Sequence, residues 1–172
     1  MEEKFITKGM VASGNVTEPR FFLNGDSKYN VRILVDKSDQ KSCTKLQQHY
    51  QRALTTGATI YKSEAFAKNE NLVSPIKEGL QYYGAKYSNY YILDVNSKVQ
   101  PQVIDKQKKL LSQECIKSGA HVYVALSFYP YSVNGRCGIS ARLHSLTFIA
   151  QGEPIVETSD AVADFADYNF DE

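Results

Sequence analysis

The sequence predicts a mainly β protein, folded as a small closed or partly open barrel. At least five segments have the residue pattern of strands, and one convincing helix lies between the early ones. This order favours a barrel over a doubly wound sheet, in which helices alternate with strands. The 172 residues are enough for one domain of ordinary size with a single core.

The element predicted most strongly is a hairpin within residues 119–150. Asn134-Gly135 separates two β-rich runs, and this pair favours a two-residue type I′ turn, which needs positive φ at both positions. Placing Val133 opposite Arg136 sets the register of both strands. The two strands then agree on one apolar face, which consists of Leu126, Phe128, Pro130, Ile139, Ala141 and Leu143.

The opposite face of this hairpin is the candidate binding surface. Its members are aromatic, basic or polar: Tyr123, Ser127, Tyr129, Tyr131, Arg136, Arg142 and, opposite Ala125, His144. Tyrosine rings offer flat surfaces on which unpaired bases stack, and arginines offer positive charge for phosphate. The alternative is a solvated sheet face in which tyrosine is present for its β propensity. Leu146 and Phe148 fall on the tyrosine side, so we expect a β-bulge after His144 or a second apolar layer.

Two strands are expected before the helix. Residues 4–16 form a weakly patterned strand that glycines interrupt, and residues 28–35 form a clearer one. In the second strand Lys28, Asn30 and Arg32 point away from the apolar side. Lys28 and Arg32 either extend a track of phosphate contacts or keep the strand soluble.

The one α-helix is predicted over residues 39–56. Its apolar stripe has helical spacing and consists of Cys43, Leu46, Tyr50, Ala53 and Leu54. Ser38 or Asp39 is suited to cap its first turn, and Gly57 suits the C′ position after its end. His49 lies beside the stripe, which favours a packed histidine over a metal ligand.

Residues 58–89 form a long excursion, interpreted either as a segment with its own local structure or as a mobile arm. Its tyrosines and lysines suit wrapping around a nucleic-acid strand or packing onto the body. A strand follows at residues 90–95, and Lys98 in the next turn is a further candidate contact. Pro101 confines the piece around residues 102–104 to a sheet edge or a strand start.

The net charge of +1 conceals an uneven distribution. Seven of the 19 acidic residues lie from Glu153 onward, where there is no Lys or Arg, so residues 1–152 hold 12 acidic against 20 basic residues. A basic domain over residues 1–152 with an acidic tail indicates a polyanionic partner. The alternative is a solvated surface with an inert tail.

The tail over residues 153–172 is predicted to be disordered, because its acids are interleaved with too few apolar side chains to form a core. We expect it to compete with nucleic acid for the basic domain. The acidic and aromatic residues near its end are Asp164, Phe165, Asp167, Tyr168, Phe170, Asp171 and Glu172.

Three segments and the tail carry a resemblance that covers residues 1–57 and 88–172: KYNVRILVDKSD, YILDVNSKVQPQVID, SGAHVYVALSFYPYSVNGRCGISARLHSLTFIAQGEP and the acidic, aromatic tail. In these residues the chain resembles a family of tailed-phage proteins first catalogued as a domain of unknown function and since recognised as single-stranded DNA-binding proteins with an OB fold. The resemblance implies an OB-fold-like Greek-key barrel of about five or more strands. It also implies sequence-tolerant binding of single-stranded DNA in phage replication or recombination. The family members' acidic, aromatic-ended tails recruit replication proteins, so the resemblance makes the seven tail residues named above candidates for binding phage or host replication proteins.

Two other classes of function remain open. The first is a protein-interaction or structural phage module whose tyrosine face docks another subunit. The second is a metal-dependent nuclease, but Asp36, Asp94 and Asp105 form no E-x-K or D-x-D pattern, and His121, His144 and Cys137 lack the spacing of a zinc or nucleophile site. We therefore expect a protein that is not an enzyme and needs no cofactor or metal.

The sequence also predicts the cellular setting. It contains no apolar run of the roughly 18 residues that span a bilayer and no apolar stretch typical of a signal peptide near its start. Three cysteines without C-x-x-C spacing favour reduced, buried thiols. We expect a cytoplasmic protein of an infected bacterial cell, with homo-oligomers possible.

Overall fold

The computed structural model describes residues 2–23, 25–155 and 161–170, in which strands dominate and helices are short except for one. The elements follow in this order: β1 (Phe5–Phe21), β2 (Ser27–Asp36), α1 (Gln40–Tyr61), α2 (Glu64–Lys68), β3 (Ile76–Glu78), α3 (Gly79–Tyr83), η1 (Ala85–Tyr87), β4 (Tyr90–Ser97), β5 (Gln102–Ile104), β6 (Leu110–Leu111), η2 (Gln113–Cys115), β7 (Ala120–Val133), β8 (Arg136–Gln151) and α4 (Ala161–Asp164).

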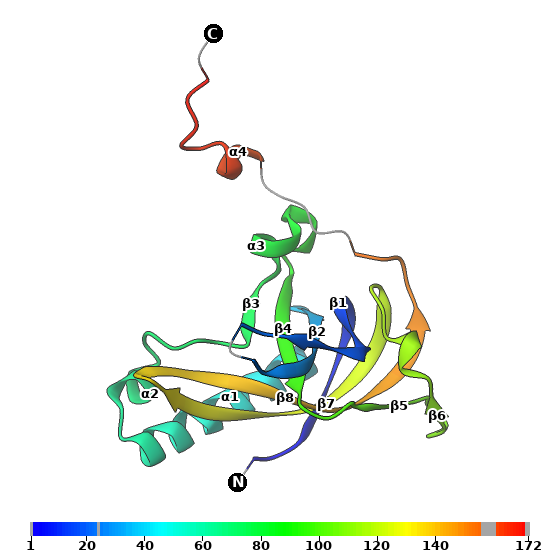
Figure 1. Ribbon diagram of the computed structural model, residues 1–172, viewed down its shortest axis with the longest axis horizontal. Coiled ribbons are helices and arrows are strands. Elements are labelled where there is room, and N and C mark those ends of the chain that lie inside the picture. The colour runs from blue at the N-terminus through cyan, green and yellow to red at the C-terminus, as the bar shows by residue number, and fades with distance from the viewer. Residues whose placement is uncertain (1, 24, 156–160, 171–172) are drawn as a thin grey trace.

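Five strands close into a barrel in the order β1-β2-β4-β8-β7 (Figure 1). Four of its seams are antiparallel, whereas β4 and β8 run parallel and meet at Asn96 and Arg142. Strand β3 pairs with β4, and β5 and β6 extend the sheet beyond β8. This arrangement confirms the predicted OB-fold-like barrel.

Strand β1 is long because it serves two neighbours. Its first half pairs with β7 and its second half with β2, with register shifts after Val11 and after Asn15. Gly14 has φ of +88°, and a Cβ there would come within 2.3 Å of the Asn30 carbonyl oxygen. The glycines that weakened the pattern over residues 4–16 therefore allow the strand to bend while it stays paired.

The β7–β8 hairpin has the predicted register, from Val133 opposite Arg136 to Leu126 opposite Leu143. A β-bulge follows, because Ala125 lies opposite Ser145 instead of His144 as predicted. The bulge returns Leu146 to the core, where it is 1% exposed. The expected bulge after His144 is thus confirmed, and its effect is to keep both halves of β8 apolar on the inside.

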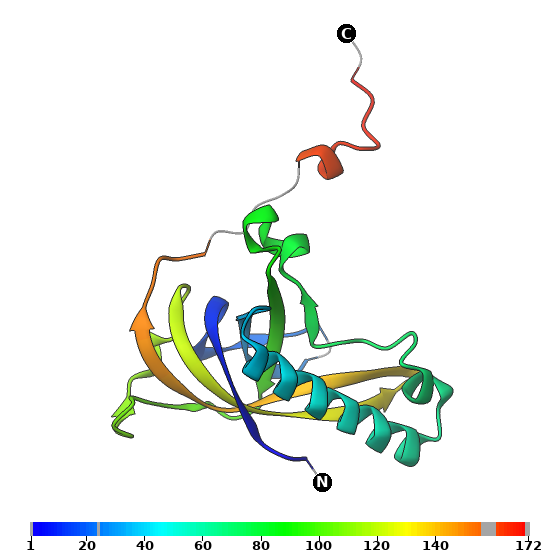
Figure 2. The same cartoon turned by 180° about the vertical axis from the view of Figure 1, so that it is seen from behind.

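Beyond the Ser127–Arg142 pair the hairpin projects past the barrel, because β1 pairs with β7 only up to Leu126 and β4 meets β8 at Arg142. We call residues 128–141 the hairpin arm; it runs beside α1 and ends near α2 (Figures 1 and 2). The segment before β3 supports its free edge, where the Val73 amide donates to the Cys137 carbonyl and the Ile139 amide to the Val73 carbonyl. The arm is therefore held from two sides.

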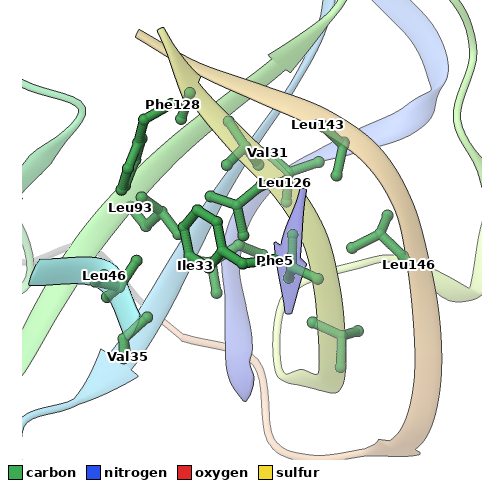
Figure 3. Packing of buried hydrophobic residues seen from close by; sticks show 14 of the residues in the cluster. Phe5, Val31, Ile33, Val35, Leu46, Leu93, Leu126, Phe128, Leu143 and Leu146 are labelled. Atoms are coloured by element: carbon green, nitrogen blue, oxygen red, sulfur yellow. The ribbon is translucent and has the colours of Figure 1, made fainter. Parts of the chain in front are cut away.

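Helix α1 packs its apolar stripe against the barrel core. All five predicted stripe residues belong to this core cluster, and Figure 3 shows Leu46 beside Val35, with Phe5 and Leu126 further inside. The Asp39 carboxylate accepts the Ser42 amide at 3.2 Å, as a helix N-cap does. His49 stacks on Phe5 with ring centroids 4.0 Å apart, so it is a packed histidine.

The predicted end of this helix at residue 56 is wrong, because α1 continues to Tyr61 and is closed by Lys62 in the left-handed conformation. Gly57 is not a C-cap. It lies inside the helix, and a Cβ there would come within 2.5 Å of the Phe66 ring. Phe66 is 1% exposed, so the glycine makes room for the residue that anchors α2 on α1.

The excursion over residues 58–89 has its own local structure, the first of the two interpretations offered above. After α2, residues 72–78 run between β4 and β8 where these strands diverge, and β3 pairs with β4 from Ile76–Leu93 to Glu78–Tyr91. Pro75 is buried there and its carbonyl accepts the Asp94 amide. This segment fills the opening in the barrel wall.

A second apolar cluster covers part of the outer barrel surface. Its buried members come from β1, β2, α3, β4 and the residues after β8: Ala12, Leu34, Tyr83, Ile92 and Ile155. Ser118 fixes Ile155 beside β1, because its hydroxyl accepts the Ile155 amide at 2.8 Å and donates to the Ala12 carbonyl at 3.0 Å. The other end of β2 and β4, where Asn30 lies opposite Asn96, is not part of this cluster.

Within the described ranges, no helix is long and apolar enough to cross a membrane. Cys43, Cys115 and Cys137 are unpaired and half-buried, whereas full burial was expected.

Replacing Gly57 with alanine is expected to destabilise the protein by about 1–2 kcal/mol, although alanine favours helix by up to about 1 kcal/mol over glycine. The physical reason is overlap of the new methyl group with the Phe66 ring. Urea unfolding measures the change, and Gln51→Ala on the exposed side of α1 is the control. A stabilised Gly57→Ala variant would show that Phe66 does not pack as described.

Candidate nucleic-acid interface

The open outer surface of β2 and β4 is polar and partly basic. Alternation places Val31, Ile33 and Val35 in the core, so Lys28, Asn30 and Arg32 face outward as predicted. On β4, Asn96 lies opposite Asn30 and Asp94 lies opposite Arg32. The Asn30 side-chain amide donates to Asn96 Oδ1 at 2.7 Å, which fixes both amide groups at the surface.

These strands belong to a continuous row of polar residues around the barrel, which we call the cross-barrel row. Neighbouring residues pair in the order Asn15, Asn30, Asn96, Arg142 and Ser127, with one residue from each of the five barrel strands. At about 4.8 Å between strands the row is about 19 Å long. An extended chain following the row meets the exposed or half-exposed side chains of Asn15, Asn30, Asn96 and Arg142, whereas Ser127 at its end is buried.

Arg32 is held in place beside this row. Its Nε donates to Asp94 Oδ1 at 3.1 Å, and its guanidinium lies 5.1 Å from the centre of the Tyr82 ring. Partial burial acts to lower the pKa of Arg32, but the charge of Asp94 and contacts with Tyr83 raise it overall. Lys77 also reaches Asp94, at 3.5 Å, and lies over the same Tyr82 ring. The cluster combines fixed cations with an aromatic surface.

The β1–β2 turn adds a second aromatic and basic cluster. The Arg20 guanidinium and the Lys28 ammonium lie 5.5 and 5.9 Å from the centre of the Phe22 ring. Next to this ring, Phe21 is 77% exposed. In the ranges that the structure describes, neither Arg20 nor Lys28 forms a salt bridge.

A groove connects the two clusters. One hollow of about 490 Å³ is bordered by Asn15, Arg20, Asn30 and Arg32. A second, of about 230 Å³, shares the last three of these residues and adds Phe22, Lys28, Asp94 and Asn96. Because the hollows share three residues, they adjoin each other along β2, and we call the two together the β2 groove.

Arg20 and Phe22 were not among the binding residues predicted from the sequence. The run FFLNGDS contains a second Asn-Gly pair, Asn24-Gly25, which is the same hairpin signal as Asn134-Gly135. It would have predicted a tight turn with exposed flanking residues; residue 24 itself lies outside the described ranges. Asn15, the first residue of the row, has no sequence signal, since only barrel closure places it there.

The hairpin arm carries two of the three predicted tyrosines. The Arg142 guanidinium lies 4.6 Å from the centre of the Tyr129 ring. Tyr131 lies across Gly138 on the paired strand, where a Cβ would come within 2.6 Å of its hydroxyl. Burial raises the pKa of Tyr131. Both rings are half-exposed on the outward face of the arm, which begins at the end of the cross-barrel row.

The other residues predicted to bind nucleic acid lie at different distances from the two arm tyrosines. Tyr123 precedes Tyr129 by roughly 20 Å along β7, on the part of the barrel where it pairs with Lys8 and Thr147. Arg136 is exposed at the tip of the arm. Lys98 is exposed one residue beyond the Tyr29–Ser97 pair, at the same end as Lys28. Lys28, Arg32 and Lys98 thus form one group, and Tyr129, Tyr131, Arg136 and Arg142 form another.

The carboxylates considered for catalysis are used in other contacts. Asp36 accepts from Ser38 and Asn89, Asp94 pairs with Arg32 and Lys77, and Asp105 caps the β5–β6 turn. His121, His144 and Cys137 lie at different positions along the β7–β8 ladder. In the part of the chain described, no group of three or more His, Cys, Asp or Glu side chains is placed to hold a metal ion.

The described part of the tail is short and aromatic. Phe165, Tyr168 and Phe170 contact one another, with ring centroids 4.8–6.1 Å apart, and all three are more than half exposed. Asp164 and Asp167 are exposed beside them. Asp171 and Glu172 lie outside the described residues. The proposed role of these seven residues stays a prediction.

The fold and its polar outer surface place the protein among OB-fold-like barrels. Similar solved structures include the single-stranded DNA-binding protein from bacteriophage Enc34 in complex with single-stranded DNA, with a TM-score of 0.71, 15% identity and 88% of each chain covered. The gp2.5 single-stranded DNA-binding protein of bacteriophage T7 matches with a TM-score of 0.61, 14% identity and 99% of this chain and 96% of that chain covered.

The family model described as the single-stranded DNA-binding protein of Enterobacter phage Enc34 matches residues 5–172. The chain belongs to this family. No curated protein sequence matches it. The predicted phage family is therefore confirmed, and the match includes residues 58–87, which the sequence resemblance did not cover.

The packed position of His144 predicts a pH dependence of stability. Burial, with a smaller contribution from Lys4, lowers the pKa of His144 in the folded protein. Near pH 6.5 the His144 side chain therefore binds a proton in the unfolded chain but not in the folded protein. As a result the free energy of unfolding falls as the pH drops from about 7.5 to 5.5.

Urea unfolding at several pH values measures this slope for the wild type and for His144→Gln. The variant should show a flatter slope, even if its stability is lower at every pH. An equal slope in both proteins would contradict the assignment; His49, whose pKa burial also lowers, is left unchanged in both.

Proposed function

We propose that this protein binds single-stranded DNA along its outer barrel surface, from the β2 groove over the cross-barrel row to the tyrosines of the hairpin arm. The observation that carries the proposal is the continuity of the cross-barrel row. It connects the cations around Phe22 with the Arg142–Tyr129 pair at the hairpin arm. The family to which the chain belongs supports the same activity.

The chemistry of this surface fits an unpaired strand. Phe22 and Tyr129 each lie close to guanidinium or ammonium groups, so an aromatic ring for base stacking and a cation for the adjoining phosphate occur together at both places. Every base has a π-face, and stacking on one is worth about 1–3 kcal/mol. We therefore propose binding with little dependence on sequence. The amides of Asn30 and Asn96 supply additional hydrogen bonds to backbone or base.

We propose no catalytic step for this protein. Its role is to hold and protect single-stranded DNA during replication or recombination in the cytoplasm of an infected bacterium. Phe165, Tyr168 and Phe170 are proposed to bind phage or host replication proteins, with the surrounding carboxylates providing the acidic context. The acidic tail as a whole, in this proposal, competes with DNA for the basic domain over residues 1–152.

The binding test is fluorescence anisotropy with labelled oligo-dT and a matching duplex at several salt concentrations. Tyr129→Ala combined with Tyr131→Ala should weaken single-strand binding at least tenfold, by about 1 kcal/mol or more per lost stack. Tyr123→Ala is the matched control, since it removes the same side chain from the same strand outside the surface. Equal losses in both variants would contradict the proposed surface.

The salt dependence tests the basic half of the surface. For single strands the logarithm of affinity falls with a slope of about −0.7 per neutralised phosphate. Arg20→Ala and Lys28→Ala should each make the slope shallower by up to about 0.7, while Lys41→Ala, on the exposed side of α1, should not. A complex that ignores salt would instead favour a protein-interaction module.

Deleting residues 158–172 should tighten DNA binding at low salt and have less effect at high salt. The reason is that the deletion removes five carboxylates that compete with phosphate for the same cations. Titration of the same oligonucleotide measures the effect. Unchanged or weaker binding by the truncated protein would contradict competition by the tail.

A further inference from the structure

The outer end of the cross-barrel row holds a closed polar network around a buried hydroxyl. Ser127 is fully buried, and its Oγ lies 2.8 Å from Glu2 Oε2 and 2.8 Å from His144 Nε2. A hydroxyl has one hydrogen, which it donates to the Glu2 carboxylate. His144 must therefore donate its Nε2–H to the Ser127 oxygen. The network has a defined direction, and it ends on the carboxylate.

The Glu2 carboxylate also pairs with Arg142. Arg142 Nη1 lies 2.8 Å from Glu2 Oε1 and 2.9 Å from Oε2, while its guanidinium covers the Tyr129 ring. One carboxylate thus accepts from a buried hydroxyl and from an arginine. This pair of donors is also suited to a phosphate oxygen, because both prefer a negatively charged acceptor.

The location of this carboxylate matters because of the row beneath it. Arg142 and Ser127 are the last two residues of the cross-barrel row, next to the tyrosines of the hairpin arm. Glu2 reaches them from the residues before β1, which begins at Phe5. Its neighbour Glu3 points elsewhere and pairs with Arg52 on α1. A DNA strand following the row to Tyr129 meets the Glu2 carboxylate first.

We propose that Ser127 and Arg142 form a phosphate subsite of the DNA-binding surface, and that Glu2 occupies this subsite as an internal phosphate mimic in the free protein. A DNA phosphate displaces the Glu2 carboxylate and takes over both donors. The Arg142 guanidinium stays over Tyr129, where the adjoining base stacks. This inference rests on the proposed function, which it extends by one specific contact and one competing group.

Displacement has two measurable consequences. The free protein must give up the Glu2–Arg142 ion pair before DNA uses this subsite, so Glu2 weakens DNA binding. In addition, the Glu2 carboxylate already neutralises the charge of Arg142 in the free protein. When a phosphate displaces it, this carboxylate stays close to the DNA without a partner. The wild-type complex therefore gains less from counterion release than a variant without this carboxylate.

The experiment compares Glu2→Gln with Glu3→Gln by anisotropy with labelled oligo-dT. Both variants remove one negative charge from adjacent positions, but only Glu2 contacts Arg142 and Ser127. Glu2→Gln should tighten binding about two- to fivefold at low salt and steepen the salt slope by up to about 0.7. Glu3→Gln should change the affinity by a clearly smaller factor than Glu2→Gln does.

A second pair of variants tests whether the effect passes through Arg142. In an Arg142→Ala background, Glu2→Gln should no longer tighten binding, because the subsite is already lost. Thermal unfolding of every variant identifies loss of folding. If the wild type binds DNA but Glu2→Gln binds equally or more weakly, Glu2 is only a structural clamp and this inference is wrong. If the folded wild type does not bind oligo-dT, the proposed function itself fails.

Discussion

The barrel is closed by the parallel contact between β4 and β8 at Asn96 and Arg142, and the arrangement of the outer surface follows from this closure. The closure brings one outward residue from each of five strands into a single row. From this point β4 and β8 diverge, which leaves an opening between them. Residues 72–78 fill it by pairing with β4 on one side and with the hairpin arm on the other. The excursion is thus part of the barrel wall.

The elements that were predicted well are those that depend only on residues close together in the sequence. The Asn134-Gly135 turn set the register of β7 and β8, and alternation placed Lys28 and Arg32 outside, because each depends only on neighbours in the sequence. The predicted end of α1 was wrong because Gly57 makes room for Phe66, nine residues later, and does not end the helix. Contacts that close the barrel have no signal in any single segment. For this reason the cross-barrel row and the packing of residues 58–89 emerged only from the structure.

Several cations on the candidate surface already have carboxylate partners. Asp94 holds Arg32 and Lys77, and Glu2 holds Arg142. Such pairs position the cations but reduce the field that attracts phosphate. The cations Arg20 and Lys28, which have aromatic neighbours instead, are therefore best placed for first contact with DNA. The surface combines a freely accessible basic end at the β1–β2 turn with an end at the arm where acidic groups compete.

The location of the DNA-binding surface can be measured from the changes in backbone and side-chain amide NMR signals on titration with oligo-dT. The proposed surface predicts the largest changes at Asn15, Asn30 and Asn96, whose amides lie along the cross-barrel row, and at the hairpin arm. Signals from Lys8, His121 and Tyr123, on the β1–β7 side of the barrel, should change little. The largest changes on that side, with the row unaffected, would contradict the account.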